Sequence, residues 1–159
     1  MEIDETMMRE VAESVLQQMF GLEVGSSDSM PSLEGEACIV ARVVISRDSE
    51  ERLVEVISPQ GTAELIAEAM FEIPRGELNA DEIHDAMGEI ANMIGGSVKG
   101  AQDGDSVLSI PAVTVDPVVS NDELNEIKFS VSGQPMIVHW GTCRPLSCES
   151  QTPVSLDME

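Results

Sequence analysis

The sequence predicts a single α/β domain of the α+β type, in which about three main helices pack on an antiparallel-rich sheet of five to six strands. Three segments carry apolar residues at helical spacing, and five short runs rich in β-branched residues lie between turn signals. Two pairs of these runs are joined by short polar loops typical of hairpins, which favours antiparallel pairing. A chain of 159 residues is long enough for one domain with its own core.

The first predicted helix covers residues 4–20, where apolar side chains recur at every fourth position. These positions are Met7, Val11, Val15 and Met19. Gly21 follows as a natural helix stop. Residues 25–36 are rich in Gly, Ser and Pro and are therefore expected to form a polar loop.

Two strands are predicted next, at 38–46 and 52–58, with a hairpin loop between them. Ser58 and Pro59 then match a helix N-cap followed by Pro at the first helical position. They open a second helix, which Pro74 ends.

The last part of the domain is predicted to return to strands. Their expected positions are 107–115, 127–132 and 135–140, and Gly133 lies in a tight turn between the last two. Residues 1–140 are therefore expected to form one domain, and residues 141–159 a polar and poorly ordered tail.

The third helix, expected at 80–99, contains the candidate functional residues. Asn79 and Glu82 match a capping box at its start, and Gly100 matches its end. Residues about 100° apart on a helical projection fall into two opposed stripes. The apolar stripe comprises Ile83, Met87, Ile90, Ile94 and Val98. The polar stripe comprises Asp85, Glu89, Asn92, Gly96 and Lys99.

Three glycines in this helix, Gly88, Gly95 and Gly96, are costly, because glycine destabilises a helix interior by about 1 kcal/mol relative to alanine. Close approach by another part of the fold or by a docking partner would explain them, and the sequence leaves both open. In an acidic chain, Asp85 and Glu89 could also be no more than a solvated face.

Composition excludes several classes of partner. Eight Lys and Arg residues against 30 Asp and Glu residues give a net charge of −22, so nucleic acids and anionic membranes would be repelled. No apolar stretch is long enough to span a bilayer, and the acidic N-terminal segment differs from a secretory signal. Three cysteines without a CxxC pair fit reduced thiols, and we expect a cytoplasmic location.

Against this background the segment DAMGEIANMIGGSVKG, at 85–100, resembles the signature helix of the CheC, CheX and FliY chemotaxis phosphatases. Their motif has Asp or Ser, three residues, Glu, two residues and Asn, which here is Asp85, Glu89 and Asn92. The following Gly96 and Lys99 resemble the CheX branch. The flanking segments GTAELIAEAMF and LSIPAV are similar to CheX segments in the same order.

This resemblance implies a phosphatase that acts on the phospho-aspartate of a CheY-like response regulator. Asn92 would be catalytic and orient the hydrolytic water, and Glu89 would pair with the regulator's active-site Lys. Asp85, Gly96 and Lys99 would contact the partner, although for Lys99 a favourable cation at the helix C-terminus is the commoner explanation. The resemblance places Mg²⁺ on the regulator, so no cofactor or metal site is expected here, and it implies a homodimer. In the first helix Glu13 is followed three residues later by Leu16, so one site per chain is expected.

Alternatives to this function remain. The same fold could serve as a non-catalytic module that docks a phosphorylated regulator, or as a dimerising structural domain. His139, Cys143 and Cys148 could be three zinc ligands, although their spacing fits no common site and His139 fits a strand better.

Overall fold

The computed structural model describes residues 2–26, 30, 32–102, 104–119 and 121–142. Its centre is a seven-stranded sheet in the order β1-β6-β7-β3-β2-β4, with β5 also paired to β2. All the ladders in it are antiparallel. The strands are β1 (Val24–Ser26), β2 (Ala37–Arg47), β3 (Glu50–Ser58), β4 (Val107–Leu108), β5 (Ala112–Pro117), β6 (Asn125–Val131) and β7 (Gln134–Thr142).

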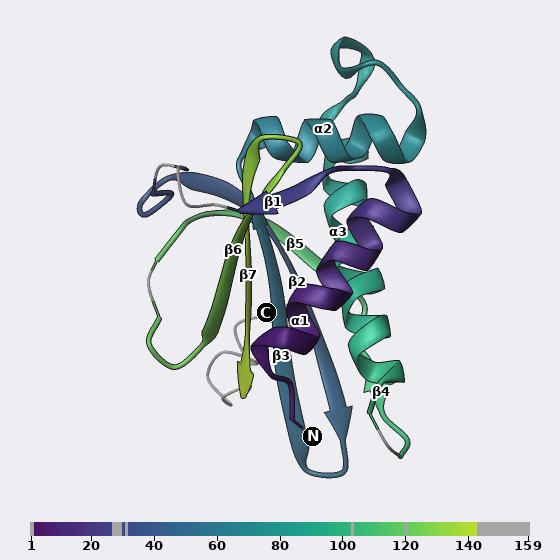
Figure 1. The fold of residues 1–159 in the computed structure, drawn as a ribbon, viewed down its shortest axis with the longest axis vertical. Helices are drawn as coiled ribbons and strands as arrows, with labels where there is room; N and C mark the ends of the chain where they lie inside the picture. Colours follow the sequence, from purple (N-terminus) through teal and green to yellow (C-terminus); the bar gives the residue numbers. More distant parts are fainter. Residues whose placement is uncertain (1, 27–29, 31, 103, 120, 143–159) are drawn as a thin grey trace, which may run out of the picture.

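The helices pack on one face of this sheet (Figure 1). They are α1 (Glu5–Glu13), which continues as a π-helical segment η1 (Ser14–Met19), then α2 (Gln60–Phe71) and α3 (Ala80–Gly100), with a 3₁₀ turn η2 (Arg75–Glu77) between the last two. α3 lies against β2 and β3 and also contacts α1 and α2. Three helices on an antiparallel sheet confirm the predicted α+β class.

Alternation along the central strands explains why the sheet has one apolar and one mixed face. On β2, Ala41, Val43 and Ile45 are buried beneath the helices, whereas Val40 and Arg42 point to the opposite face. That opposite face carries a second, smaller apolar cluster. Its members are Leu33, Cys38, Val40, Ile57, Val118 and Ile137.

The first helix forms where it was expected. The Asp4 carboxylate caps it by accepting a hydrogen bond of 2.8 Å from the Met7 backbone N–H. Gly21 ends the helical segment with φ +68°, a left-handed conformation in which glycine meets no Cβ penalty.

Four local expectations need correction. Residues 24–26 form β1, which was not expected, so the described part of the chain contributes seven strands to the sheet. The run at 107–115 is two strands, because the chain leaves the ladder between Leu108 and Ala112. Pro59 itself occupies the N-cap position of α2, and Ser58 belongs to β3. β7 continues through Thr142, beyond the boundary drawn at residue 140, and residues 143–159 lie outside the described part.

Candidate active site

α3 begins at the predicted capping box. The Asn79 side-chain oxygen accepts a hydrogen bond of 2.8 Å from the Glu82 backbone N–H. In return, Glu82 Oε1 accepts one of 3.0 Å from the Asn79 backbone N–H. Each bond satisfies a backbone donor that would otherwise be unpaired at the helix start, which fixes where α3 begins and thus its rotational phase.

The inward face of α3 is fully apolar. Ile83 is 5% exposed, and Met87, Ile90, Ile94 and Val98 are completely buried, as the apolar stripe predicts. On the outward face Asp85 and Glu89 are exposed, and Asn92, Gly96 and Lys99 are half-buried. The helical phase predicted from the sequence is therefore confirmed.

Two of the three glycines are explained by the fold. A Cβ built on Gly95 would lie 2.7 Å from Val43 Cγ2, and one on Gly88 would lie 3.3 Å from Val113 Cγ2. Gly95 thus lets β2 approach the helix closely, and Gly88 does the same for β5. Gly96 differs, since a Cβ there would meet only Leu108 Cδ2 at 3.9 Å.

The structure brings the predicted residues together on one accessible strip of α3. Glu89 and Asn92 are three positions apart, a rise of about 4.5 Å along the helix, and their side chains point outward. The side chains of Asp85, Glu89, Asn92 and Lys99 make no hydrogen bond or ion pair with another described residue. A carboxylate and a carboxamide on such a strip can accept from, and donate to, a partner without breaking an internal contact.

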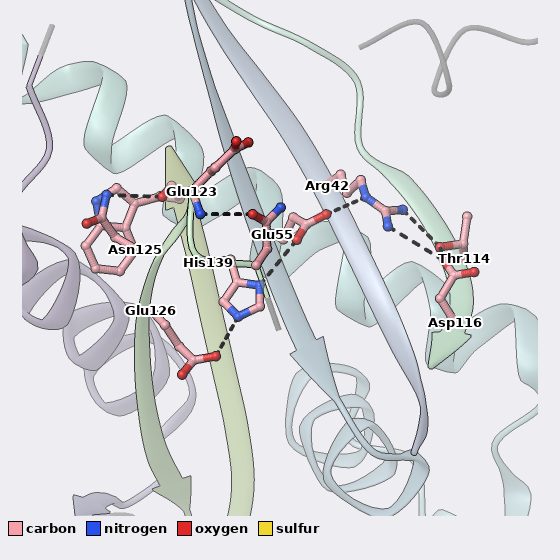
Figure 2. A network of polar contacts seen from close by, with 10 residues as sticks. Arg42, Glu55, Thr114, Asp116, Glu123, Asn125, Glu126 and His139 are labelled. Carbon is pink, nitrogen blue, oxygen red and sulfur yellow. Dashed lines mark hydrogen bonds and ion pairs between the residues drawn. The ribbon is translucent and has the colours of Figure 1, made fainter. Parts of the chain in front are cut away.

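The opposite face of the sheet holds a polar network that sequence analysis missed (Figure 2). Arg42 Nε donates a hydrogen bond of 2.6 Å to Glu55 Oε2. Glu55 Oε1 lies 3.5 Å from His139 Nδ1, and Glu126 Oε2 lies 2.7 Å from His139 Nε2. Arg42 also donates to Thr114 Oγ1 at 3.0 Å. The network therefore crosses the five adjacent strands β5, β2, β3, β7 and β6.

The sequence carried one signal for this network. Arg42 stands inside the otherwise apolar run CIVARVVIS, and a charge there requires a partner on the same face of the sheet. The partner could be identified only once the register was known, because Arg42 pairs with Glu55 and Glu55 with His139 across two separate ladders.

A cavity of about 270 Å³ lies beside this network and is lined by Arg42, Glu55 and His139 among others. None of the five residues predicted on α3 lines it. The network therefore belongs to the open face of the sheet, and the predicted functional strip lies on the helical side.

The zinc alternative gains no support from geometry. Both ring nitrogens of His139 face carboxylates, and Cys143 and Cys148 lie outside the described residues. Over the described ranges no group of three or more His, Cys, Asp or Glu side chains is arranged to hold a metal ion. The helices in the same ranges include none that is long and apolar enough to cross a bilayer.

Comparison with solved structures shows that the chain has the fold seen in CheX and CheC-like proteins. It resembles the chemotaxis protein CheX from Vibrio vulnificus with a TM-score of 0.66 and 19% identity, covering 86% of this chain and 93% of that one. CheX from Desulfovibrio desulfuricans gives a TM-score of 0.66 and 17% identity, covering 86% and 96% of the two chains.

A structure of the CheX-CheY-BeF3-Mg complex from Borrelia burgdorferi is also similar, with a TM-score of 0.62, 19% identity and coverage of 90% and 100%. The profile of the family described as chemotaxis phosphatase CheX matches residues 39–128, which is more than half of the chain. The protein belongs to this CheX family. No curated protein sequence matches it.

Proposed function

We propose that this protein hydrolyses the phospho-aspartate of a CheY-like response regulator and that both proteins act in the cytoplasm. The observation that carries the proposal is the pair Glu89 and Asn92, which stand one turn apart on the accessible strip of α3, where neither side chain pairs with another described residue. Membership of the phosphatase family supports it. The Borrelia burgdorferi relative, solved with CheY, BeF3 and magnesium, supports the choice of partner.

Hydrolysis of the phospho-aspartate requires the enzyme mainly to position the attacking water. A phospho-aspartate is an acyl phosphate, and its hydrolysis needs a water in line with the bond that breaks. The water oxygen bonds to phosphorus, the bond from phosphorus to the aspartyl oxygen breaks, and inorganic phosphate leaves the regenerated carboxylate. Asn92 would hold this water, because a neutral carboxamide can both donate and accept without repelling the phosphoryl oxygens.

Glu89 would act one turn away as an anchor. Its carboxylate can form a charge-assisted hydrogen bond with a lysine of the regulator's phosphorylation site. Asp85, Gly96 and Lys99 would extend the contact along the same strip, and Gly96 has no side chain to hold a partner away from the helix. Mg²⁺ would be held by the regulator.

A second candidate is a binding module that docks the phosphorylated regulator without hydrolysing it. It would use the same accessible strip, so the fold alone fits both functions. Hydrolysis is favoured because the chain has both the anchoring carboxylate and the carboxamide that would hold the water.

The test follows inorganic phosphate released from a phosphorylated CheY-like regulator with catalytic amounts of this protein. Several turnovers per chain are expected, above the rate at which the regulator loses phosphate alone. Binding is measured in parallel with the regulator trapped as its beryllofluoride complex. Tight binding without accelerated release would support the binding module, and neither binding nor release would contradict both candidates.

A further inference from the structure

Ile110 is the most exposed of the large hydrophobic side chains in the described residues, with a relative accessibility of 88%. It lies between β4 and β5, where the chain leaves the ladder with β2. A single exposed aliphatic side chain is ordinary on a protein surface. Ile110 is unusual because its position is fixed and because it lies close to the strip of α3 that carries Glu89 and Asn92.

The backbone around Ile110 is held to the sheet. The Ser109 backbone N–H donates a hydrogen bond of 2.9 Å to the Val44 carbonyl. The Val44 backbone N–H donates one of 2.8 Å to Ser109 Oγ. Pro111 follows and restricts the backbone further. Ile110 is therefore presented from an anchored backbone, and little conformational entropy would be lost if a partner covered it.

The glycines of α3 locate Ile110 along the helix. A Cβ on Gly88 would lie 3.6 Å from Pro111 Cβ, and a Cβ on Gly95 would lie 3.0 Å from Leu108 Cδ1. The segment 108–111 thus runs antiparallel to α3 along its glycine side. Ile110 directly precedes Pro111 in this segment. It therefore lies beside the part of the helix between Gly88 and Gly95.

This part of the helix is the one that carries Glu89 and Asn92. On a helical projection Asn92 lies only about 40° from Gly88, so it leans toward the 108–111 side of α3. Standard backbone and helix dimensions then limit the separation of the Ile110 and Asn92 Cα atoms to roughly 17 Å.

We propose that Ile110 is an apolar docking anchor for the phosphorylated response regulator, next to the site on α3. This inference rests on the proposed function. A standard interface buries about 800 Å² on each partner, which is a disc with a radius of roughly 16 Å. Such an interface is roughly 32 Å across, so one that includes Asn92 can also cover Ile110.

The anchor adds the contact that the strip on α3 lacks. Its outward residues are polar, charged or glycine, and contacts of this kind govern orientation and rate of association more than affinity. Binding energy in interfaces is concentrated in a few desolvated side chains surrounded by polar ones. The partner is thus expected to carry an apolar side chain near its phospho-aspartate, facing Ile110.

The test compares Ile110→Ser with a matched variant, Val119→Ser. Val119 is also β-branched and 66% exposed, but it lines the cavity on the opposite face of the sheet. Phosphate release is measured over a range of phosphorylated CheY-like regulator concentrations. Ile110→Ser should raise KM roughly tenfold with kcat within twofold of the wild type, and Val119→Ser should change neither. Ile110→Leu should restore KM, and circular dichroism confirms folding.

The outcomes separate this inference from the function on which it rests. A wild-type protein that releases no phosphate would overturn both. An active wild type with the same KM for Ile110→Ser and Val119→Ser would overturn the anchor alone. A fall in kcat without a change in KM for Ile110→Ser would also overturn it, because an anchor acts on binding.

Discussion

The Nε2 atom of His139 lies 2.7 Å from Oε2 of Glu126, its direct cross-strand neighbour on β6. Burial disfavours the charged imidazolium, but the hydrogen bonds that its ring N–H groups donate to Glu55 and Glu126, together with the negative charges of these carboxylates, outweigh burial, so the pKa of His139 is raised. For Glu55, burial is likewise outweighed by His139 and Arg42, and its pKa is lowered. The two groups thus stabilise each other in their charged forms.

This pairing predicts a pH-dependent stability. A raised histidine pKa contributes stability that is complete below the unfolded value, about 6.5, and is lost as the pH rises through the folded pKa. A lowered glutamate pKa contributes stability that is complete above about 4.3 and is lost as the pH falls. The network should therefore stabilise the fold most between these two values.

Urea unfolding of the wild type and of His139→Gln at several pH values measures the contribution. The difference in unfolding free energy should be about 2 kcal/mol near pH 6 and should shrink as the pH rises. His84 and the large negative charge are common to both proteins, so they cancel in the comparison. A difference that stays constant up to pH 9 would mean that His139 is not protonated in the folded protein.

Gly95 and Gly96 are predicted to respond in opposite ways to alanine. At Gly95 the new Cβ would lie 2.7 Å from Cγ2 of Val43, which is fully buried and stiff at χ1, so Gly95→Ala should destabilise the fold by about 1–3 kcal/mol. At Gly96 the nearest atom is 3.9 Å away, so Gly96→Ala should stabilise α3 by up to about 1 kcal/mol. Thermal unfolding compares the two, and equal effects would contradict the packing role of Gly95.

The start and the rotational phase of α3 could be predicted from the sequence, because the residues that determine them lie at or within the helix itself. The capping box sets the start, the apolar stripe sets the phase, and the positions of Ile90 and Asn92 follow from these two. β1 was missed for the opposite reason. Its three residues carry no strand pattern of their own and join the sheet by pairing with β6, more than 100 residues later.

The glycines and the polar network show where local reasoning stops. Gly88 and Gly95 could accommodate either a docking partner or another part of the same fold. Which of these holds depends on the strands that pack beside α3, and the structure places Val113 next to Gly88 and Val43 next to Gly95. The role of His139 depends likewise on the register of two ladders. Both are properties of tertiary pairing, which the residue pattern of one segment does not contain.

We expect the protein to form a homodimer, and the sheet edge gives a physical reason. In the described part of the chain β5 pairs only with β2, and Val115 on it is 56% exposed. An open edge strand invites pairing with a second copy, which closed symmetry would satisfy. Each chain carries a charge of −22, so added salt should strengthen the dimer by screening repulsion. Sedimentation equilibrium that finds only monomer at tens of micromolar in high salt would contradict this.

Glu89→Ala is predicted to weaken docking more than turnover. Its exposed carboxylate has no internal hydrogen bond or ion pair with a described residue, so folding should be unaffected. Loss of a charge-assisted contact to the regulator should raise KM by roughly tenfold or more. At saturating regulator most of the wild-type kcat should return. A variant with normal KM and a greatly reduced kcat would assign Glu89 to the chemical step instead.

Asn92→Ala is predicted to remove catalysis while leaving the fold intact. Asn92 is half-buried on a helix, and alanine is the better helix former there, so thermal stability should not fall. If the carboxamide holds the attacking water, its loss should lower kcat by roughly 10²-fold, or about 3 kcal/mol, with little change in KM. Binding of Asn92→Ala to the beryllofluoride form of the regulator serves as the control and should be near that of the wild type. Near-normal turnover by folded Asn92→Ala would exclude the water-positioning role, and hydrolysis would then have to depend on another group of the complex.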